Sequence, residues 1–113
     1  MPDVFCKIID GEIQAEVYYR DKDFIVIQDI NPQAPVHLLI IPIRHIVKFA
    51  ECVDTDCDFL GNALLIAEKM AQETGLKEGY RLIVNQGPHG GQVVQHIHFH
   101  LLGGRVLGPK LVK

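Results

Sequence analysis

The sequence predicts an α+β domain in which one long helix covers one face of a small antiparallel sheet. Four or five short segments carry the alternation or the apolar run of a strand, and one long segment repeats apolar residues at helical spacing. The early strands are joined by short loops, which favours antiparallel pairing. With 113 residues, the chain fits a single domain spanning residues 1–113.

A short helix and three strands are predicted in the first half of the chain. Apolar residues recur at the spacing of an amphipathic helix before the strands begin; Asp3 is expected to cap this helix and Gly11 to end it. Pro42 has no backbone N–H, so it should break the third strand or push it to a sheet edge. The predicted ranges are 4–9 for the helix and 17–20, 24–28 and 37–43 for the strands.

The main helix is predicted from about Thr55 to Thr74. Asp54 or Thr55 is its expected N-cap, and Gly75 is expected to stop it. Its core-facing stripe is predicted to contain Leu60, Ala63, Leu64, Ala67, Met70 and Ala71. Two further strands are predicted over residues 80–85 and 95–102, with a glycine-bearing loop at 86–92 between them.

Composition and charge exclude several classes of function. A net charge of −3 with scattered Lys and Arg argues against binding to nucleic acid or to a membrane surface. The longest apolar run, residues 38–43, is too short to span a bilayer, and residues 1–10 lack the core of a signal peptide. Three cysteines without disulfide-rich spacing favour a reducing compartment. We therefore expect a cytoplasmic protein with neither a nucleic-acid nor a membrane partner.

Three histidines in alternate positions mark the strongest candidate site. Strand periodicity places His96, His98 and His100 on one face, opposite the apolar residues between them. The simpler interpretation is a half-buried strand with a polar histidine face. Because imidazole titrates near neutrality, three in register instead predict a functional site. Ile97 and Phe99 should face the main helix, so the histidines should face away from it.

A glycine-bearing loop runs directly into this histidine strand. Gly90 and Gly91 allow backbone N–H groups to turn toward a ligand, which predicts a phosphate cradle beside the histidines. The alternative is an ordinary turn between two strands. Neither a P-loop nor a Rossmann motif is present in the sequence.

The sequence contains possible zinc and calcium ligands, but it does not predict a bound metal ion. The three strand histidines could bind zinc, and Cys6, His45 and His96 could form a separate structural site in which Asp3 would be the fourth ligand. The acidic residues 54–58 resemble the start of a calcium loop, but the sixth position is Phe59 rather than glycine. We therefore predict no tight metal site and no cofactor.

The segment 85–105 resembles the histidine-triad (HIT) superfamily, in its Hint branch. The signature is three histidines, each followed by an apolar residue, with a further apolar residue at the end. The resemblance continues through residues 29–37, 41–45 and 5–13, so it covers nearly the whole chain in the right order. The Gly-Gly-Arg-x-Leu-Gly-Pro tail is similar to that of bacterial members.

The resemblance implies a five-stranded antiparallel sheet in each protomer and a homodimer with a continuous ten-stranded sheet. It also implies a purine nucleoside phosphoramidase, which hydrolyses the P–N bond of substrates such as adenosine 5′-phosphoramidate and binds AMP or GMP. A nucleotide-binding regulatory or scaffold protein with vestigial catalysis remains an alternative, as does a zinc-binding structural protein.

Site residues carry over by position. His98 matches the nucleophile, His37 and His100 match the supporting histidines, and His96 is counted with the catalytic histidines. Asp29 matches the ribose-binding carboxylate. The full nucleotide-binding set implied by the resemblance is Ile27, Asp29, Ile30, Asn85, Gly91, Gln92, Val93, His98 and His100, with the two isoleucines lining the base pocket.

Two departures from the family pattern bear on the site, and two surfaces bear on assembly. Many Hint proteins have a serine or another polar residue where Val93 stands, and some bacterial relatives have a zinc-binding cysteine where Asp3 stands.

For the dimer, strand 80–85 offers an open sheet edge, and Ile66 and Met70 offer a second surface on the helix.

Overall fold

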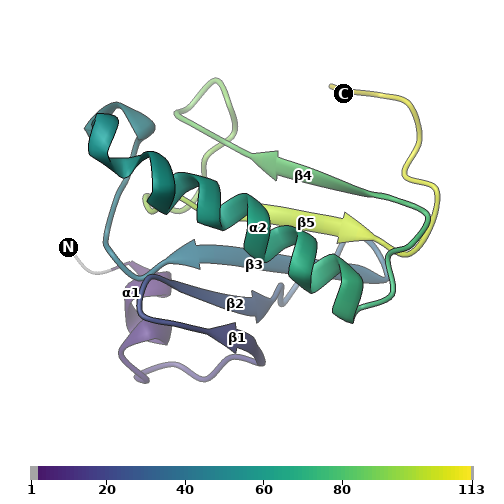
Figure 1. Cartoon of the computed structure of the whole chain (residues 1–113), viewed down its shortest axis with the longest axis horizontal. Coiled ribbons are helices and arrows are strands. Elements are labelled where there is room, and N and C mark those ends of the chain that lie inside the picture. Colours follow the sequence, from purple (N-terminus) through teal and green to yellow (C-terminus); the bar gives the residue numbers. More distant parts are fainter. Residues whose placement is uncertain (1–2, 113) are drawn as a thin grey trace.

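A computed structural model of the chain describes residues 3–112. These residues form one five-stranded sheet in the order β1-β2-β3-β5-β4, with every neighbouring pair antiparallel (Figure 1). The strands are β1 Val17–Arg20, β2 Phe24–Gln28, β3 Val36–Pro42, β4 Tyr80–Val84 and β5 Phe99–Gly103. The helices are α1 Val4–Ile9 and α2 Cys57–Glu73, with short 3-10 turns at Phe49–Glu51 and Asp54–Asp56. The predicted α+β fold is confirmed.

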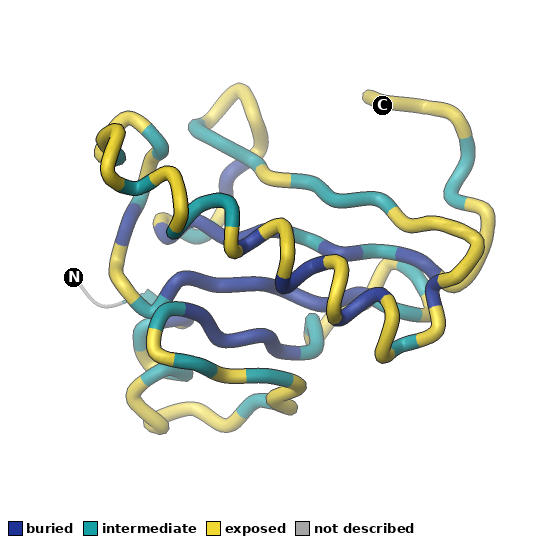
Figure 2. The backbone as a smooth tube through the Cα atoms, viewed as in Figure 1, coloured by how far each residue is buried: buried dark blue, intermediate teal, exposed yellow. Residues whose placement is uncertain are grey.

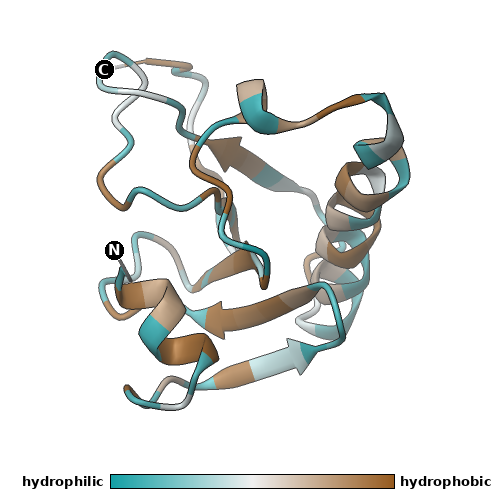
Figure 3. Cartoon of the chain, turned by 90° about the vertical axis from the view of Figure 1, so that its left-hand side faces the viewer, coloured by the Kyte–Doolittle hydropathy of each residue, from teal (hydrophilic) through white to brown (hydrophobic). Residues whose placement is uncertain are grey.

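The two helices lie on opposite faces of the sheet (Figure 3). The larger core lies between α2 and the sheet, and the smaller one lies beneath α1; both draw alternate residues from β2 and β3, whose chains are buried along their length (Figure 2). Strand alternation explains the division, since Val26 and Ile40 face α2 while Ile25 and Ile41 face α1.

Helix α1 forms as the sequence predicts. The Asp3 carboxylate accepts the Cys6 backbone N–H at 2.8 Å, which satisfies one of the unpaired donors of the first turn. The helix ends at Ile9 with Asp10 as its C-cap, followed by Gly11 with a φ of 82°, a conformation that glycine adopts without strain. The N-cap therefore also fixes the side chain of Asp3 beside Cys6.

Pro42 ends its strand, as one of the two predicted outcomes requires, but the alternative that it pushes the strand to a sheet edge is wrong. Strand β3 lies between β2 and β5, near the middle of the sheet, and Pro42 is its last residue, paired with Phe24. A terminal position avoids the missing ladder hydrogen bond. The Pro42 carbonyl accepts a hydrogen bond from His96 Nε2 at 2.8 Å.

Helix α2 begins at Cys57, two residues later than predicted. The preceding acids form a 3-10 turn, in which the Asp56 carboxylate accepts the Val53 N–H at 2.9 Å. The buried face is also rotated from the prediction, because Leu64 is 54% exposed while Ile66 is buried. Ile66 and Met70 belong to the core, so they cannot provide the second dimer surface that the sequence suggested.

The last two strands are shorter than predicted. β4 ends at Val84, and β5 begins at Phe99, so His96 and His98 precede the ladder rather than lie in it. The predicted orientation holds nonetheless, since Ile97 and Phe99 pack in the α2 core while His98 packs against Phe5 of α1. Within residues 3–112, neither helix is long and apolar enough to cross a membrane.

Candidate functional site

Three histidine rings meet on the sheet face that carries α1. His37 comes from β3 and His100 from the neighbouring β5, and their Nε2 and Nδ1 atoms lie 2.9 Å apart. The ring of His98, just before β5, lies 5.1 Å from that of His100 between centroids. His37 and His98 are buried, and His100 is partly buried. The structure thus brings together three of the four histidines that the sequence predicted to be catalytic.

Hydrogen bonds determine which nitrogen of His37 and His100 carries the proton. The Gln33 backbone N–H donates to His37 Nδ1 at 3.0 Å, so the proton of neutral His37 resides on Nε2. That Nε2–H faces His100 Nδ1, which must accept it, and it also lies 3.4 Å from a carboxylate oxygen of Asp29. Neutral His100 therefore carries its own proton on Nε2.

Both histidines of the β5 segment are held in the neutral state. Burial, together with His98 and His37, lowers the pKa of His100 to about 4, against the opposing effect of Asp29. Burial also lowers the pKa of His98, against the opposing effect of its hydrogen bond to the His96 carbonyl. Near neutral pH His98 and His100 therefore present uncharged imidazoles.

His98 has one nitrogen engaged and one free. Its Nδ1 lies 2.8 Å from the His96 carbonyl oxygen, to which Nδ1–H must donate. The lone pair of the neutral ring is therefore on Nε2, the nucleophilic form of imidazole. The Phe5 ring packs against His98 nearly edge-on, with centroids 4.9 Å apart, and limits its rotation.

Asp29 follows the end of β2 and is fixed by the loop that begins there. One carboxylate oxygen accepts the Asn31 N–H at 2.8 Å, and its own N–H donates to the His37 carbonyl at 3.0 Å. Of the two predicted base-pocket residues, Ile27 is buried in the core beneath α1, whereas Ile30 is 97% exposed. This places an exposed apolar side chain next to a fixed carboxylate.

The glycine-bearing loop, residues 86–92, is held by hydrogen bonds between its own backbone groups. The N–H groups of Gly90, Gly91 and Gln92 donate to carbonyls of Gly87 and Pro88. In this structure the three N–H groups of the expected phosphate cradle are therefore paired within the loop. Gly90 is required by sterics, because a Cβ there would lie 2.2 Å from a backbone oxygen of Gln86.

Side chains reinforce the same loop. Gln92 accepts the Gly87 N–H at 2.9 Å and donates to the Val47 carbonyl at 3.0 Å, and Asn85 donates to the Gly90 carbonyl at 2.7 Å. The predicted phosphate contacts Asn85, Gly91 and Gln92 thus use these groups within the loop. The backbone N–H groups of Val93 and Val94 find no acceptor among residues 3–112.

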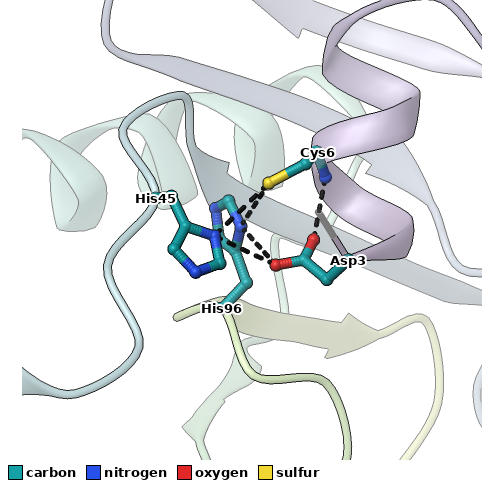
Figure 4. A group of neighbouring side chains, drawn as sticks. All are labelled: Asp3, Cys6, His45 and His96. Atoms are coloured by element: carbon teal, nitrogen blue, oxygen red, sulfur yellow. Dashed lines mark hydrogen bonds and ion pairs between the residues drawn. The ribbon is translucent and has the colours of Figure 1, made fainter. Parts of the chain in front are cut away.

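His96 lies in a second cluster with Asp3, Cys6 and His45 (Figure 4). One Asp3 carboxylate oxygen lies 3.1 Å from Nδ1 of both His45 and His96. Cys6 Sγ lies 3.3 Å from His45 Nδ1 and 3.7 Å from His96 Nδ1. His96 is fully buried and its Nδ1 makes its polar contacts in this cluster, so the structure separates it from the group of His37, His98 and His100.

The second cluster fits a tetrahedral metal ion. Zinc binds nitrogen and oxygen at about 2.0 Å and sulfur at about 2.3 Å, which gives tetrahedral edges of roughly 3.3 Å between N and O and roughly 3.6 Å between N and S. The corresponding distances here are 3.1 Å twice, and 3.3 and 3.7 Å. Burial opposes ionisation of Asp3, but the Cys6 N–H and His96 outweigh it and lower its pKa. All three donor types, carboxylate oxygen, thiolate sulfur and imidazole nitrogen, are ones that zinc accepts.

Some positioning groups were invisible to sequence reasoning. The Gln33 N–H and the carbonyls of Pro42 and His96 decide the state of three histidine rings, yet backbone groups leave no mark on residue type. The apolar spacing of residues 4–9 predicts that Phe5 lies in a helix and does not indicate that its ring contacts His98.

Comparisons with known proteins agree with this geometry. A sequence profile described as the HIT domain matches residues 10–107. An uncharacterized HIT-like protein from Chlamydia trachomatis is 47% identical over 108 residues, covering 96% of this chain and 97% of that protein. A HIT family hydrolase from Clostridium thermocellum superposes with a TM-score of 0.92 at 48% identity, covering 97% of this chain and 96% of that one.

Two further solved structures carry informative descriptions. A histidine triad nucleotide-binding protein from Candida albicans matches with a TM-score of 0.80 at 32% identity, covering 99% of this chain and 86% of that one. A Zn-bound histidine triad family protein from Mycobacterium smegmatis matches with a TM-score of 0.78 at 31% identity, covering 92% and 76%.

Proposed function

The chain belongs to the HIT domain family, and from that membership we propose that it is a hydrolase acting on purine nucleotides. Similarity to a family hydrolase and to a nucleotide-binding member supports this class of activity. More specifically, we propose that it cleaves the P–N bond of nucleoside 5′-phosphoramidates through a nucleotidyl-histidine intermediate. The observation that carries the proposal is the free Nε2 lone pair of neutral His98.

In the proposed first step, His98 Nε2 attacks the α-phosphorus. A bond from Nε2 to phosphorus forms as the P–N bond breaks, and the bonding electron pair leaves with the amine, which takes up a proton from solvent. In the second step, water attacks phosphorus and loses a proton to solvent, the bond from phosphorus to Nε2 breaks, and the lone pair returns to Nε2 as the nucleoside monophosphate is released. Splitting one displacement into two easier ones is the advantage of covalent catalysis.

The surrounding groups have complementary proposed roles. Val93 and Val94 offer unpaired backbone N–H groups for the phosphate oxygens, in place of the glycine N–H groups that the loop uses itself. His37 donates its Nε2–H to His100, so that the Nε2–H of His100 is available to the phosphate. Asp29 would accept hydrogen bonds from the ribose hydroxyls, and Ile30 would cover the base.

Turnover on a panel of adenosine and guanosine phosphoramidates tests the activity, and mass spectrometry of the quenched reaction tests the intermediate. We expect release of AMP or GMP and a transient nucleotidyl adduct on His98. Nucleotide binding with neither turnover nor adduct would instead support a regulatory or scaffold role.

We also propose a homodimer. Strand β4 is an edge of the sheet, and its end residues Tyr80 and Val84 are exposed. An open edge carries unpaired backbone groups that a second copy could satisfy across a two-fold axis. Light scattering at micromolar concentration should give the mass of two chains; the mass of one chain would contradict the proposal.

The second cluster would hold a metal in this scheme through Asp3, Cys6, His45 and His96. Such an ion would supply structural cross-linking, since four protein ligands leave no open position for substrate. The proposed hydrolysis therefore assigns it no step.

A further inference from the structure

We propose that Gln92 is a positioning residue for the phosphate of the nucleotide, and that it acts by anchoring one end of a backbone arch, residues 93–96, to the connector after β3. The arch carries the N–H groups of Val93 and Val94, which find no acceptor within residues 3–112. The inference rests on the proposed function, because it assumes that these two N–H groups bind phosphate oxygens. It gives the Gln92 side chain a role different from the direct phosphate contact that the sequence predicted.

Two neighbouring carbonyls of the connector hold the two ends of the arch. The Val47 carbonyl accepts a hydrogen bond from the Gln92 side-chain amide at 3.0 Å. The Ile46 carbonyl accepts the backbone N–H of Ile97 at 2.7 Å. Residues 93–96 therefore span two anchors that lie side by side on one segment of the chain.

The connector is itself held in place by other contacts. The Ile46 side chain is buried in the core beneath α2, and the Glu51 carboxylate accepts the Val47 N–H at 3.1 Å. The Phe49 N–H donates to the side-chain oxygen of Gln86 at 2.9 Å. The two carbonyls that anchor the arch thus belong to a segment that is fixed independently of the arch.

The Gln92 side chain is buried, and both ends of its amide are bonded to backbone groups. Its Oε1 accepts the Gly87 N–H at 2.9 Å, and its Nε2 donates to the Val47 carbonyl at 3.0 Å. Its backbone N–H also donates to the Gly87 carbonyl at 3.0 Å. These three bonds fix the point from which the chain leaves the glycine-bearing loop toward Val93. The task requires an acceptor and a donor on one side chain, which an amide supplies.

The arch leads directly to His98. The His96 N–H donates to the Val94 carbonyl at 2.9 Å, and the His96 carbonyl accepts the Nδ1–H of His98 at 2.8 Å. The position of the Val93 and Val94 N–H groups relative to the His98 ring therefore depends on the conformation of the arch. Donors stabilise developing charge most effectively when they are already fixed in place. Of the two anchors, the one at Gln92 is a side chain, so substitution can remove it.

Two substitutions separate this role from a general effect on folding. In Gln92→Glu at pH 7.5, the introduced carboxylate can accept the Gly87 N–H but has no proton to donate to the Val47 carbonyl. Burial and the Glu51 carboxylate, which is bonded to the Val47 N–H, favour its protonation as the pH falls, and the resulting O–H restores the donor. Gln92→Met keeps the length of the side chain and has neither group at any pH.

The binding probe is adenosine 5′-methylphosphate, a phosphodiester that keeps one negative charge between pH 5 and 7.5, and adenosine is its reference. Relative to the wild-type chain at the same pH, Gln92→Met should lose roughly 10- to 100-fold in affinity for the ester, the value of a hydrogen bond to a charged group. Gln92→Glu should show the same loss at pH 7.5 and recover most of it at pH 5. Affinity for adenosine, which has no phosphate, should stay the same. Calorimetry measures all four quantities.

The matched control is Gln86→Glu, which makes the same change of charge in the same loop. A carboxylate keeps the bond from the Phe49 N–H and loses only the donation to the adjacent Asn85 carbonyl at 3.2 Å. The ratio of ester affinity to adenosine affinity in this variant should therefore equal that of the wild-type chain at both pH values.

Amide ¹H–¹⁵N NMR of Val93 and Val94 gives a second readout. The ester should shift both signals in the wild-type chain and in Gln86→Glu, and neither signal in Gln92→Met. Wild-type affinity and shifts in Gln92→Met, or a loss in Gln92→Glu that acid does not reverse, would overturn the inference and leave the proposed hydrolase standing. Neither readout requires turnover. A chain that showed both but hydrolysed no phosphoramidate would therefore contradict the proposed hydrolase and support this role of Gln92.

Discussion

Two histidine clusters lie side by side on one face of the sheet and differ in what their rings are held by. In the pocket of His37, His98 and His100, a backbone N–H, a carbonyl and a neighbouring imidazole direct the protons, and the Nε2 lone pair of His98 is left free. In the cluster of Asp3, Cys6, His45 and His96, the donor atoms converge on a common centre. The same residue type is thus suited to nucleophilic attack in one place and to metal ligation in the other.

The carboxylates follow the same division. The Asp29 carboxylate lies 3.4 Å from Nε2 of His37 and also accepts the Asn31 N–H of its own loop. It therefore lies at the edge of the histidine pocket. Asp3 lies 3.1 Å from two histidine nitrogens and faces the sulfur of Cys6. The carboxylate of Asp29 contacts one histidine nitrogen and can still bind a ligand. The carboxylate of Asp3 is surrounded by three donor atoms and is suited to binding a metal ion together with them.

The strongest test of this division compares His98→Ala with His96→Ala. His98→Ala should reduce turnover by roughly a thousandfold or more, because it removes the proposed nucleophile. It should retain nucleotide binding, since other residues build most of the pocket. Steady-state hydrolysis and equilibrium binding of AMP measure the two effects.

His96→Ala should act mainly on stability. The residue is fully buried and hydrogen-bonded to Pro42, so its loss should cost about 2–4 kcal/mol of the free energy of unfolding, measured in urea. His89→Ala, at an exposed position, is the control. The division would be wrong if the folded His96 variant lost the nucleotidyl adduct while the His98 variant kept it.

Sequence periodicity predicted most of the fold because burial follows it. Strands β1 and β2 and helix α1 have the predicted bounds, since each is a short segment with clear end signals. The predicted secondary structure was wrong where contacts between distant residues determine the conformation. Pro42 lies at the end of a central strand, and the acids before α2 form a 3-10 turn that delays the helix.

The sequence predicted which residues contribute to the candidate site, but not which of the histidines lie together. Alternation correctly placed His98 opposite Ile97, yet it also assigned His96 to the same group. His96 lies on the face predicted by alternation, since its ring contacts Phe5 of α1 as that of His98 does. Its contact with Asp3 joins residues more than 90 positions apart, which spacing along the sequence does not reveal.

The second prediction concerns Asp29, the carboxylate beside the first cluster, which consists of His37, His98 and His100. If it accepts the ribose hydroxyls, Asp29→Ala should weaken AMP binding by about 1.5–3 kcal/mol, the usual value for hydrogen bonds to a charged group. Calorimetry with AMP and its 2′-deoxy analogue measures it. Equal affinity of the wild-type chain for the two ligands would rule out this role, and Asp10→Asn is a control at a carboxylate outside the pocket.

A third prediction uses the pH dependence of folding stability. The pKa of His100 is lowered from 6.5 to about 4 in the folded chain, so the unfolded chain binds more protons between these values. Stability should therefore be fully present above pH 6.5 and fall as pH decreases toward 4. His98 contributes in the same direction.

Urea unfolding from pH 7.5 to 4, in the presence of a chelator, measures this effect for the first cluster with the second kept free of metal. His100→Gln should flatten the curve across that window. An unchanged slope in the variant would show that His100 is not held neutral by folding. The lowered pKa values of Asp3, Asp21, Asp56 and Glu68 also reduce stability as pH falls below about 5, so the comparison with His100→Gln is what isolates the contribution of His100.

The smallest expected effect comes from removing the tail after Gly104. Arg105 donates to the Gln33 carbonyl at 3.2 Å, and the Gln33 N–H in turn fixes the tautomer of His37, so the tail contacts the first cluster through one loop. Arg81 also binds the Gly108 carbonyl, which holds the tail along β4, the proposed dimer edge. Truncation should change the ratio of kcat/KM for adenosine and guanosine phosphoramidates by a few-fold, because the loop beside the nucleotide loses one tether. It should change the unfolding free energy by no more than about 1 kcal/mol, since these are single, partly exposed hydrogen bonds. Zinc affinity should stay the same, because no hydrogen bond or ion pair joins residues 105–112 to Asp3, Cys6, His45 or His96. A truncated chain that lost zinc affinity but kept its substrate preference would reverse this assignment of the tail to the first cluster.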